Sequence, residues 1–111
     1  PFEYCIKNAD GKMVIGLLSD KGEFAYDGFE IAGGYTELEY DANIVKIRIH
    51  GNSGLRKITL PFQAIPLQNM KEVEMDNKNN RGSVIRIKYT SGGLGVANGD
   101  AGYKEYILKK K

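Results

Sequence analysis

Residues 37–50 read ELEYDANIVKIRIH and contain the clearest β-hairpin pattern in the chain. Apolar and polar side chains alternate on both sides of a turn signal at Asp41, Ala42 and Asn43. Such alternation, with many β-branched residues, is typical of half-buried antiparallel strands. We therefore predict two strands, over 35–41 and 44–50. Their inward side chains are Thr36, Leu38 and Tyr40 on the first strand, and Val45, Ile47 and Ile49 on the second.

The polar face of this hairpin carries acidic residues on the first strand and basic residues on the second. A turn centred between the two strands places Glu37 and Glu39 near Arg48 and Lys46. Side chains directly opposite each other in an antiparallel pair have Cβ atoms about 4.5–5.5 Å apart. We therefore favour a ladder of ion pairs that fixes the register over a free positive surface for an anionic partner. His50 lies beyond this ladder with no evident carboxylate opposite, so we consider a role other than a structural one for it.

A second hairpin further along the chain repeats the acidic-then-basic order. Glu72 and Glu74 alternate with apolar residues on its first strand, and Arg86 and Lys88 do so on its second. We predict the same neutralisation by cross-strand pairs there. A basic strand that remained unpaired would be free to contact an anion. The candidate contacts to a protein or an anionic partner are therefore Lys46, Arg48, His50, Arg86 and Lys88.

Short apolar runs separated by Gly, Asn and Asp continue along the rest of the chain. The 14 glycines and 3 prolines are typical of a turn-rich β protein. No segment shows a sustained apolar stripe at helical spacing, and we expect at most one helical turn, at 67–70. Pro61 and Pro66 indicate an edge or a corner of a sheet. The further strands are predicted over 2–7, 12–18, 23–26, 29–32, 56–60, 72–76, 83–89 and 103–108.

The predicted fold is mainly β, with little or no helix, arranged as a small antiparallel barrel or a two-sheet sandwich. A chain of 111 residues is expected to form one domain, 1–111. Residues 91–102 are rich in glycine and are predicted to be a flexible loop. They lack the Gly-Lys-Ser/Thr ending of a phosphate-binding loop, and they precede a strand where a dinucleotide site requires a helix.

The bulk composition argues against several classes of protein. Sixteen basic and 14 acidic side chains give a net charge of +2, too balanced to imply nucleic-acid or membrane binding by itself. No apolar run approaches the roughly 18 residues of a membrane-spanning helix. Cys5 is the only cysteine, so no internal disulfide is possible. We expect a cytoplasmic protein from a bacterial or phage setting.

Few residues offer reactive chemistry. A pair formed by Cys5 and His50 would be a possible nucleophile, but no local signature surrounds either residue, and structural roles are more frequent for both. One cysteine and one histidine cannot form a structural zinc site. Asp10, Asp20 and Asp27 occupy turn signals and do not begin an alternating calcium loop. We therefore predict no catalytic, cofactor-binding or metal-binding residues.

The order of features from Gly33 to Leu108 resembles the bacterial pleckstrin-homology-like domains. The matching pieces are YDANIVKI at 40–47, IPLQNMKEV at 65–73 and GSVIRI at 82–87. The resemblance implies a barrel scaffold that binds proteins or lipids and has no catalytic residues. That family closes one end of its barrel with a C-terminal helix, and this chain shows no such helix.

These patterns favour a non-catalytic binding or assembly module that acts through protein–protein contacts. A chain with so many strands is expected to expose a sheet edge, where a partner or a second copy can pair. The alternative is a small barrel that binds nucleic acid or anionic lipid through Lys46, Arg48, Arg86 and Lys88. A hydrolase with a cleft beside the glycine-rich segment is a third, less favoured reading.

Overall fold

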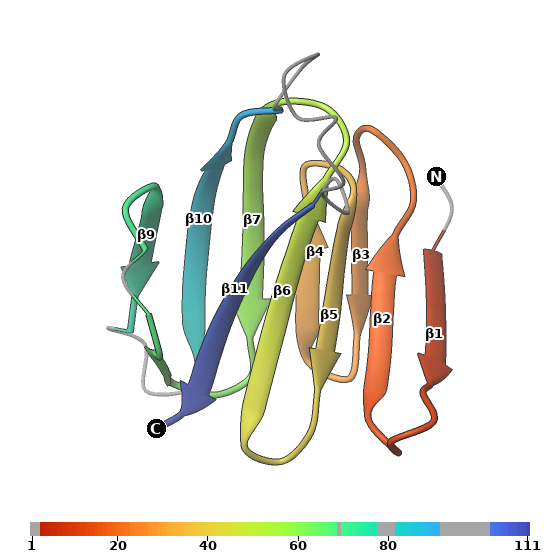
Figure 1. Cartoon of the computed structure of the whole chain (residues 1–111), viewed down its shortest axis with the longest axis vertical. Coiled ribbons are helices and arrows are strands. Elements are labelled where there is room, and N and C mark those ends of the chain that lie inside the picture. The colour runs from red at the N-terminus through yellow and green to blue at the C-terminus, as the bar shows by residue number, and fades with distance from the viewer. Residues whose placement is uncertain (1–2, 69, 78–81, 92–102) are drawn as a thin grey trace.

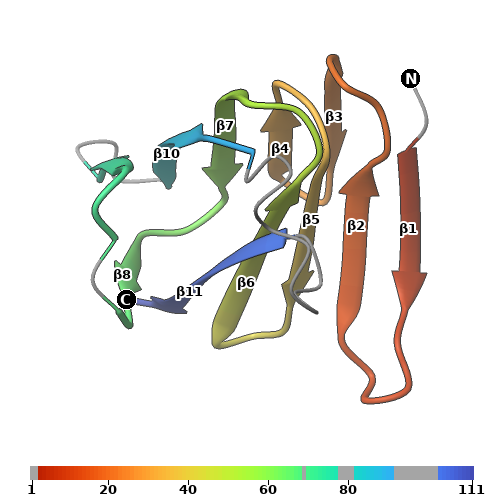
Figure 2. The same cartoon turned by 45° about the horizontal axis from the view of Figure 1, so that its top comes forward.

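The chain folds as a sandwich of two antiparallel β-sheets, shown by a computed structural model in Figure 1. The structure describes residues 3–68, 70–77, 82–91 and 103–111. Sheet A lies toward the viewer in Figure 1 and sheet B behind it; the turned view in Figure 2 separates the two layers. In spatial order, sheet A contains β1 (Glu3–Lys7), β2 (Met13–Leu17), β5 (Thr36–Tyr40), β6 (Ile44–His50), β11 (Tyr103–Lys110) and β8 (Ala64–Pro66). Sheet B contains β3 (Glu23–Tyr26), β4 (Phe29–Ala32), β7 (Gly54–Leu60), β10 (Ser83–Tyr89) and β9 (Val73–Asp76).

The hairpin that the opening sequence predicts is β5 and β6, and its register is confirmed. Tyr40 lies opposite Val45, so the turn is centred on residues 42 and 43. The Asp41 carboxylate caps this turn by accepting hydrogen bonds from the backbone N–H groups of Asn43 (2.8 Å) and Ile44 (2.9 Å). An aspartate that closes a turn in this way explains the sharp reversal between the two strands.

The core lies between the inward faces of the two sheets. The inward positions predicted for the β5–β6 hairpin are buried, and β2 is buried along most of its length. β-Branched and other aliphatic side chains fill this layer, as expected for facing sheets. Its fully buried members include Ile15, Leu17, Leu38, Val45, Ile47, Ile49, Ile58, Ile85, Ile87 and Leu108.

Of the two predicted architectures, the sandwich is confirmed and the closed barrel is wrong. The strands form two separate sheets, and each sheet has two edge strands: β1 and β8 in sheet A, β3 and β9 in sheet B. On the β8 side, closure would need continued pairing from a strand of only three residues that ends at Pro66. Proline has no backbone N–H to donate, which suits an edge position and confirms the edge predicted there.

No helix occurs among the described residues, in agreement with the prediction of little or no helix. Consequently, none of the segments that the structure describes could cross a bilayer as a helix. Residue 69, within the expected helical turn, lies outside the described residues, as does nearly all of the glycine-rich segment 91–102. The predicted strand at the end of the chain is confirmed as β11, which pairs with β6 on one side and β8 on the other.

Candidate binding surfaces

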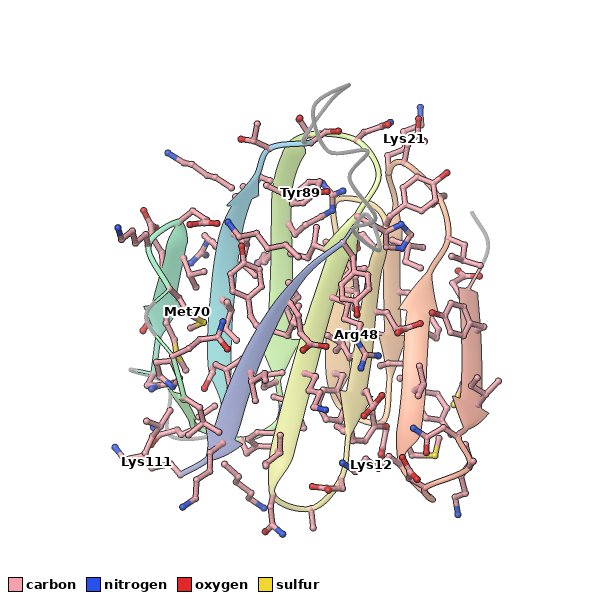
Figure 3. All side chains as sticks on the ribbon, in the orientation of Figure 1. Lys12, Lys21, Arg48, Met70, Tyr89 and Lys111 are labelled. Atoms are coloured by element: carbon pink, nitrogen blue, oxygen red, sulfur yellow. The ribbon has the colours of Figure 1, made fainter. Side chains whose placement is uncertain are left out.

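The outer face of sheet A carries a network of charged side chains around Arg48. Figure 3 labels this residue over β5 and β6. Its guanidinium donates to Glu37 (Nη1 to Oε1, 2.8 Å), to Glu39 (Nη2 to Oε1, 3.1 Å) and to Glu105 of β11 (Nε to Oε2, 2.8 Å). The Tyr4 hydroxyl of β1 donates to Glu37. Four strands are thereby joined across their solvent-facing side.

This network neutralises the basic strand of the opening hairpin, as predicted. Glu37 lies opposite Arg48 and Glu39 opposite Lys46, whose Nζ is 4.0 Å from the Glu39 carboxylate. The third carboxylate, Glu105, leaves the cluster with more negative than positive groups. An anionic partner would have to displace these carboxylates, so Lys46 and Arg48 do not form a free anion-binding surface.

His50 lies beside this network, within a row of aromatic rings. Its ring is 5.2 Å from that of Tyr35, and Tyr103 is its cross-strand neighbour on β11. Burial lowers the pKa of the imidazole below its usual value. The negative charge of Glu37 raises this pKa, whereas the positive charge of Arg56 lowers it further. A depression of about 310 Å³ is lined by His50, Arg48, Glu37 and Tyr103. The neighbour of His50 is thus an aromatic ring, in keeping with the expectation that no carboxylate lies opposite it.

The second hairpin, β9 and β10, forms as predicted but lacks the predicted ion pairs. Glu74 lies opposite Arg86, yet no described carboxylate forms an ion pair with Arg86 or Lys88. Glu72 instead pairs with Lys104 of sheet A and accepts a hydrogen bond from the buried Tyr106 hydroxyl (3.1 Å). The tertiary fold, which brings β11 against the start of β9, therefore overrides the local charge pattern.

Arg86 and Lys88 lie together on the outer face of sheet B. Arg86 is directly opposite Lys57 of β7, and Lys88 is opposite the exposed Leu55. A depression of about 270 Å³ includes Leu55, Arg86 and Lys88 in its lining, together with Lys71 and Glu74. Like charges directly opposite each other in a sheet are destabilising. The candidate residues therefore divide between two surfaces: Lys46, Arg48 and His50 lie on sheet A, and Arg86 and Lys88 lie on sheet B.

Arg56 of β7 is a buried cation that sequence reasoning missed. Only 1% of its surface is exposed, and it donates to backbone carbonyls of four residues and lies 5.3 Å from the Tyr89 ring centre. Burial lowers the pKa of its guanidinium. The sequence did contain a signal for this burial. Arg56 lies two residues before the inward Ile58, and alternate residues of a strand share one face. The carbonyls belong to Tyr35, His50, Asn52 and Gly54.

The structure does not bring Cys5 and His50 together. Cys5 is aligned across the sheet with the inward Ile15 and Leu38, whereas His50 shares the outward face with Arg48. A strand presents its two faces in opposite directions, so these side chains cannot form a nucleophile–base pair. Among the described residues, no group of three or more His, Cys, Asp or Glu side chains is placed to hold a metal ion.

No strand of the described part of the chain pairs with the outer edge of sheet A at β1. Figure 1 shows this strand projecting beyond β3, the corresponding edge of sheet B. Four of its five residues are exposed, including Ile6 at 54%, and only Tyr4 is half-buried. Tyr4 lies across Gly16 of β2, where an added Cβ would overlap the ring, and its hydroxyl reaches Glu37. β1 is therefore held by its pairing with β2 and by the Tyr4 side chain, while most of its residues are exposed to solvent.

No protein-family model, curated protein or solved structure matches this chain. The functional assignment therefore depends on the surfaces described above.

Proposed function

We propose that the domain is a non-catalytic binding and assembly module that acts through protein–protein contacts at the β1 edge. The observation that carries the proposal is the open ladder of β1, together with the exposed Ile6. A strand edge offers unpaired backbone N–H and C=O groups, and added strands bind to such edges by main-chain hydrogen bonds. The separation of Cys5 from His50 on opposite faces of sheet A favours binding over catalysis.

The proposal is tested by blocking the β1 edge without disturbing the fold. Cys5→Pro removes one backbone N–H that faces away from β2, and proline is tolerated on edge strands in that orientation. Proteins that co-purify with the domain from its native cell should be lost with Cys5→Pro and retained with Lys57→Gln, a change on the outer face of sheet B. A specific turnover by the purified protein that His50→Ala or Cys5→Ala abolishes would contradict a non-catalytic role.

We propose a cytoplasmic setting in a bacterium or in phage-infected cells. Cys5 is a free thiol on an exposed strand, which suits a reducing compartment. The resemblance of 33–108 to pleckstrin-homology-like domains stays a prediction, and it favours the same class, a scaffold that binds proteins or lipids.

A second candidate function is the binding of nucleic acid or anionic lipid on sheet B. The observation that favours it is the direct opposition of Lys57 and Arg86, with Lys88 on the same face. An anion seated between these side chains would relieve their repulsion. Binding of a fluorescent oligonucleotide and of phosphatidylserine vesicles should then weaken with salt and with Arg86→Gln. Lys46→Gln on sheet A is the matched control, and equal effects of the two substitutions would exclude sheet B as the site.

A further inference from the structure

The backbone groups on the free edge of β1 can be assigned from its turn. The Asn8 N–H donates to the Lys12 carbonyl across the β1–β2 turn (2.9 Å). Backbone groups alternate in direction along a strand, so Tyr4 and Ile6 also direct theirs toward β2. Glu3, Cys5 and Lys7 consequently direct their N–H and C=O groups away from the sheet. On the free edge, every second residue therefore presents a backbone N–H donor and a C=O acceptor to solvent.

The sequence of this strand, EYCIK, is complementary to itself when reversed. Cys5 is its central residue. In an antiparallel pair centred on Cys5, Glu3 lies opposite Lys7 of the second copy, and Tyr4 lies opposite Ile6. Each charged side chain then meets its opposite charge, and the exposed Ile6 lies at the position opposite Tyr4 of the second copy.

We propose that two copies of the domain pair through their β1 edges, antiparallel and centred on Cys5, so that two A sheets become one continuous sheet. This inference rests on the proposed function and names its partner as a second copy of this chain. The pairing satisfies all three outward-facing residues of each strand. It also lies where β1 projects beyond β3, the edge strand of sheet B on that side (Figure 1).

The edges at β8 and β9 suit self-pairing less well than the β1 edge does. β8 has three residues and ends at Pro66, which cannot donate. β9 reads VEMD, and an antiparallel self-pair centred on Met75 places Glu74 opposite Asp76 of the second copy. Acidic residues opposite each other are unfavourable. Of these three edges, β1 is thus the one whose charges favour antiparallel pairing with a second copy of itself.

The contact is small, so the dimer is expected to be reversible. Five residues of edge strand bury less than the roughly 1,600 Å² of a standard interface, and we expect a dissociation constant on the order of 10–1,000 µM. Each single charge reversal at Glu3 or Lys7 converts two attractive pairs to two repulsive pairs. That change should weaken the dimer by roughly tenfold or more.

Sedimentation equilibrium over a wide range of protein concentration is the primary test, run under reducing conditions. Wild type should dimerise reversibly, whereas Glu3→Lys and Lys7→Glu should each remain monomeric. A one-to-one mixture of the two variants should dimerise again, because each new charge then faces its complement. The double variant Glu3→Lys/Lys7→Glu should dimerise alone. Glu30→Lys, an equal change of charge at an exposed position of β4, is the control and should behave as wild type.

Oxidative crosslinking gives an independent readout of the register. Residues that exchange both hydrogen bonds in an antiparallel pair have Cα atoms about 5.5 Å apart, within the range that a disulfide spans. With added diamide, two Cys5 thiols would lose two protons and two electrons to the oxidant as the S–S bond forms. Crosslinking should be fast for wild type and for the mixed variants, and slow for either variant alone.

A wild-type protein that stays monomeric at every concentration would overturn the inference. So would variants that associate as tightly as wild type while circular dichroism shows all of them folded. If self-association fails but Cys5→Pro still loses the co-purifying proteins, the edge binds a different protein and the proposed function stands. If Cys5→Pro also retains those proteins, the proposed function fails as well.

Discussion

Replacing Arg56 by methionine should cost the domain a large part of its stability. The guanidinium Nη2 donates to the carbonyls of His50 and Asn52, both at 2.8 Å, and these bonds hold the loop between β6 and β7. Two longer contacts reach Tyr35 (3.4 Å) and Gly54 (3.3 Å). Methionine has a similar length but cannot donate, so the substitution leaves these carbonyls without their partner.

The expected loss is about 2–4 kcal/mol in the free energy of unfolding. A hydrogen bond to a charged group contributes roughly 1.5–3 kcal/mol, and two short bonds are lost. Removing the buried charge offsets part of this loss, because burial of the guanidinium is itself unfavourable, as its lowered pKa indicates. Against a typical total of about 5–15 kcal/mol for a domain, the change is large.

Urea unfolding followed by far-ultraviolet circular dichroism measures this change. Lys57→Met is the matched control, since it makes the same substitution at the neighbouring exposed position of β7, and it should stay within about 0.5 kcal/mol of wild type. Arg56→Lys should fall between the two, because lysine keeps the charge but not the planar fork of donors. Equal unfolding midpoints for Arg56→Met and Lys57→Met would refute the structural role assigned to Arg56.

Three further changes follow from the contacts of sheet A. Gly16→Ala should displace the Tyr4 ring and destabilise the protein by about 1 kcal/mol, and amide exchange in β1 should accelerate while exchange in β10 does not. The His50 pKa, followed by NMR, should lie below its usual value of 6.5 and fall further with Glu37→Gln. The neutral His50 side chain therefore contributes to folding stability above about pH 6.5, and this contribution is lost as pH falls through the folded-state pKa. An unshifted midpoint would contradict the burial of the imidazole. The turn hydrogen bonds lower the Asp41 pKa, so Asp41→Ala should cost about 0.5 kcal/mol at neutral pH. That cost should shrink as pH falls below 3.8; a cost that does not change with pH would exclude the carboxylate as its source.

The local periodicity of the sequence was sufficient for the described strands other than β8, which was not predicted because its three residues are too few to show alternation. The β5–β6 hairpin has the predicted register because both the alternation and the opposite charges specify the same pairing, of Glu37 with Arg48 and Glu39 with Lys46. In β10, the same alternation separates Arg86 and Lys88 from Ile85 and Ile87, which enter the core. It could not decide between a barrel and a sandwich, since closure depends on whether edge strands such as β8 continue the ladder.

The surfaces depended on contacts between segments far apart in the chain, which periodicity does not report. Glu72 pairs with Lys104, 32 residues away, and it forms no ion pair with Lys88, which lies across from it on β10. Glu105, which joins the Arg48 network, also comes from a distant strand. Composition suggested that a strand edge would be exposed, but only the order of strands in the sheet identified it as β1.

Amide hydrogen exchange of β1, measured by NMR in dilute and in concentrated protein, tests the central claim most directly. In dilute protein, the amides of Tyr4 and Ile6 should be protected by β2, whereas those of Cys5 and Lys7 should exchange rapidly because they face solvent. At high concentration, Cys5 and Lys7 should become protected while Ile15, in the core, is unchanged. Slow exchange at Cys5 and Lys7 in the dilute protein, or fast exchange there at every concentration, would contradict a free edge that pairs with a second copy.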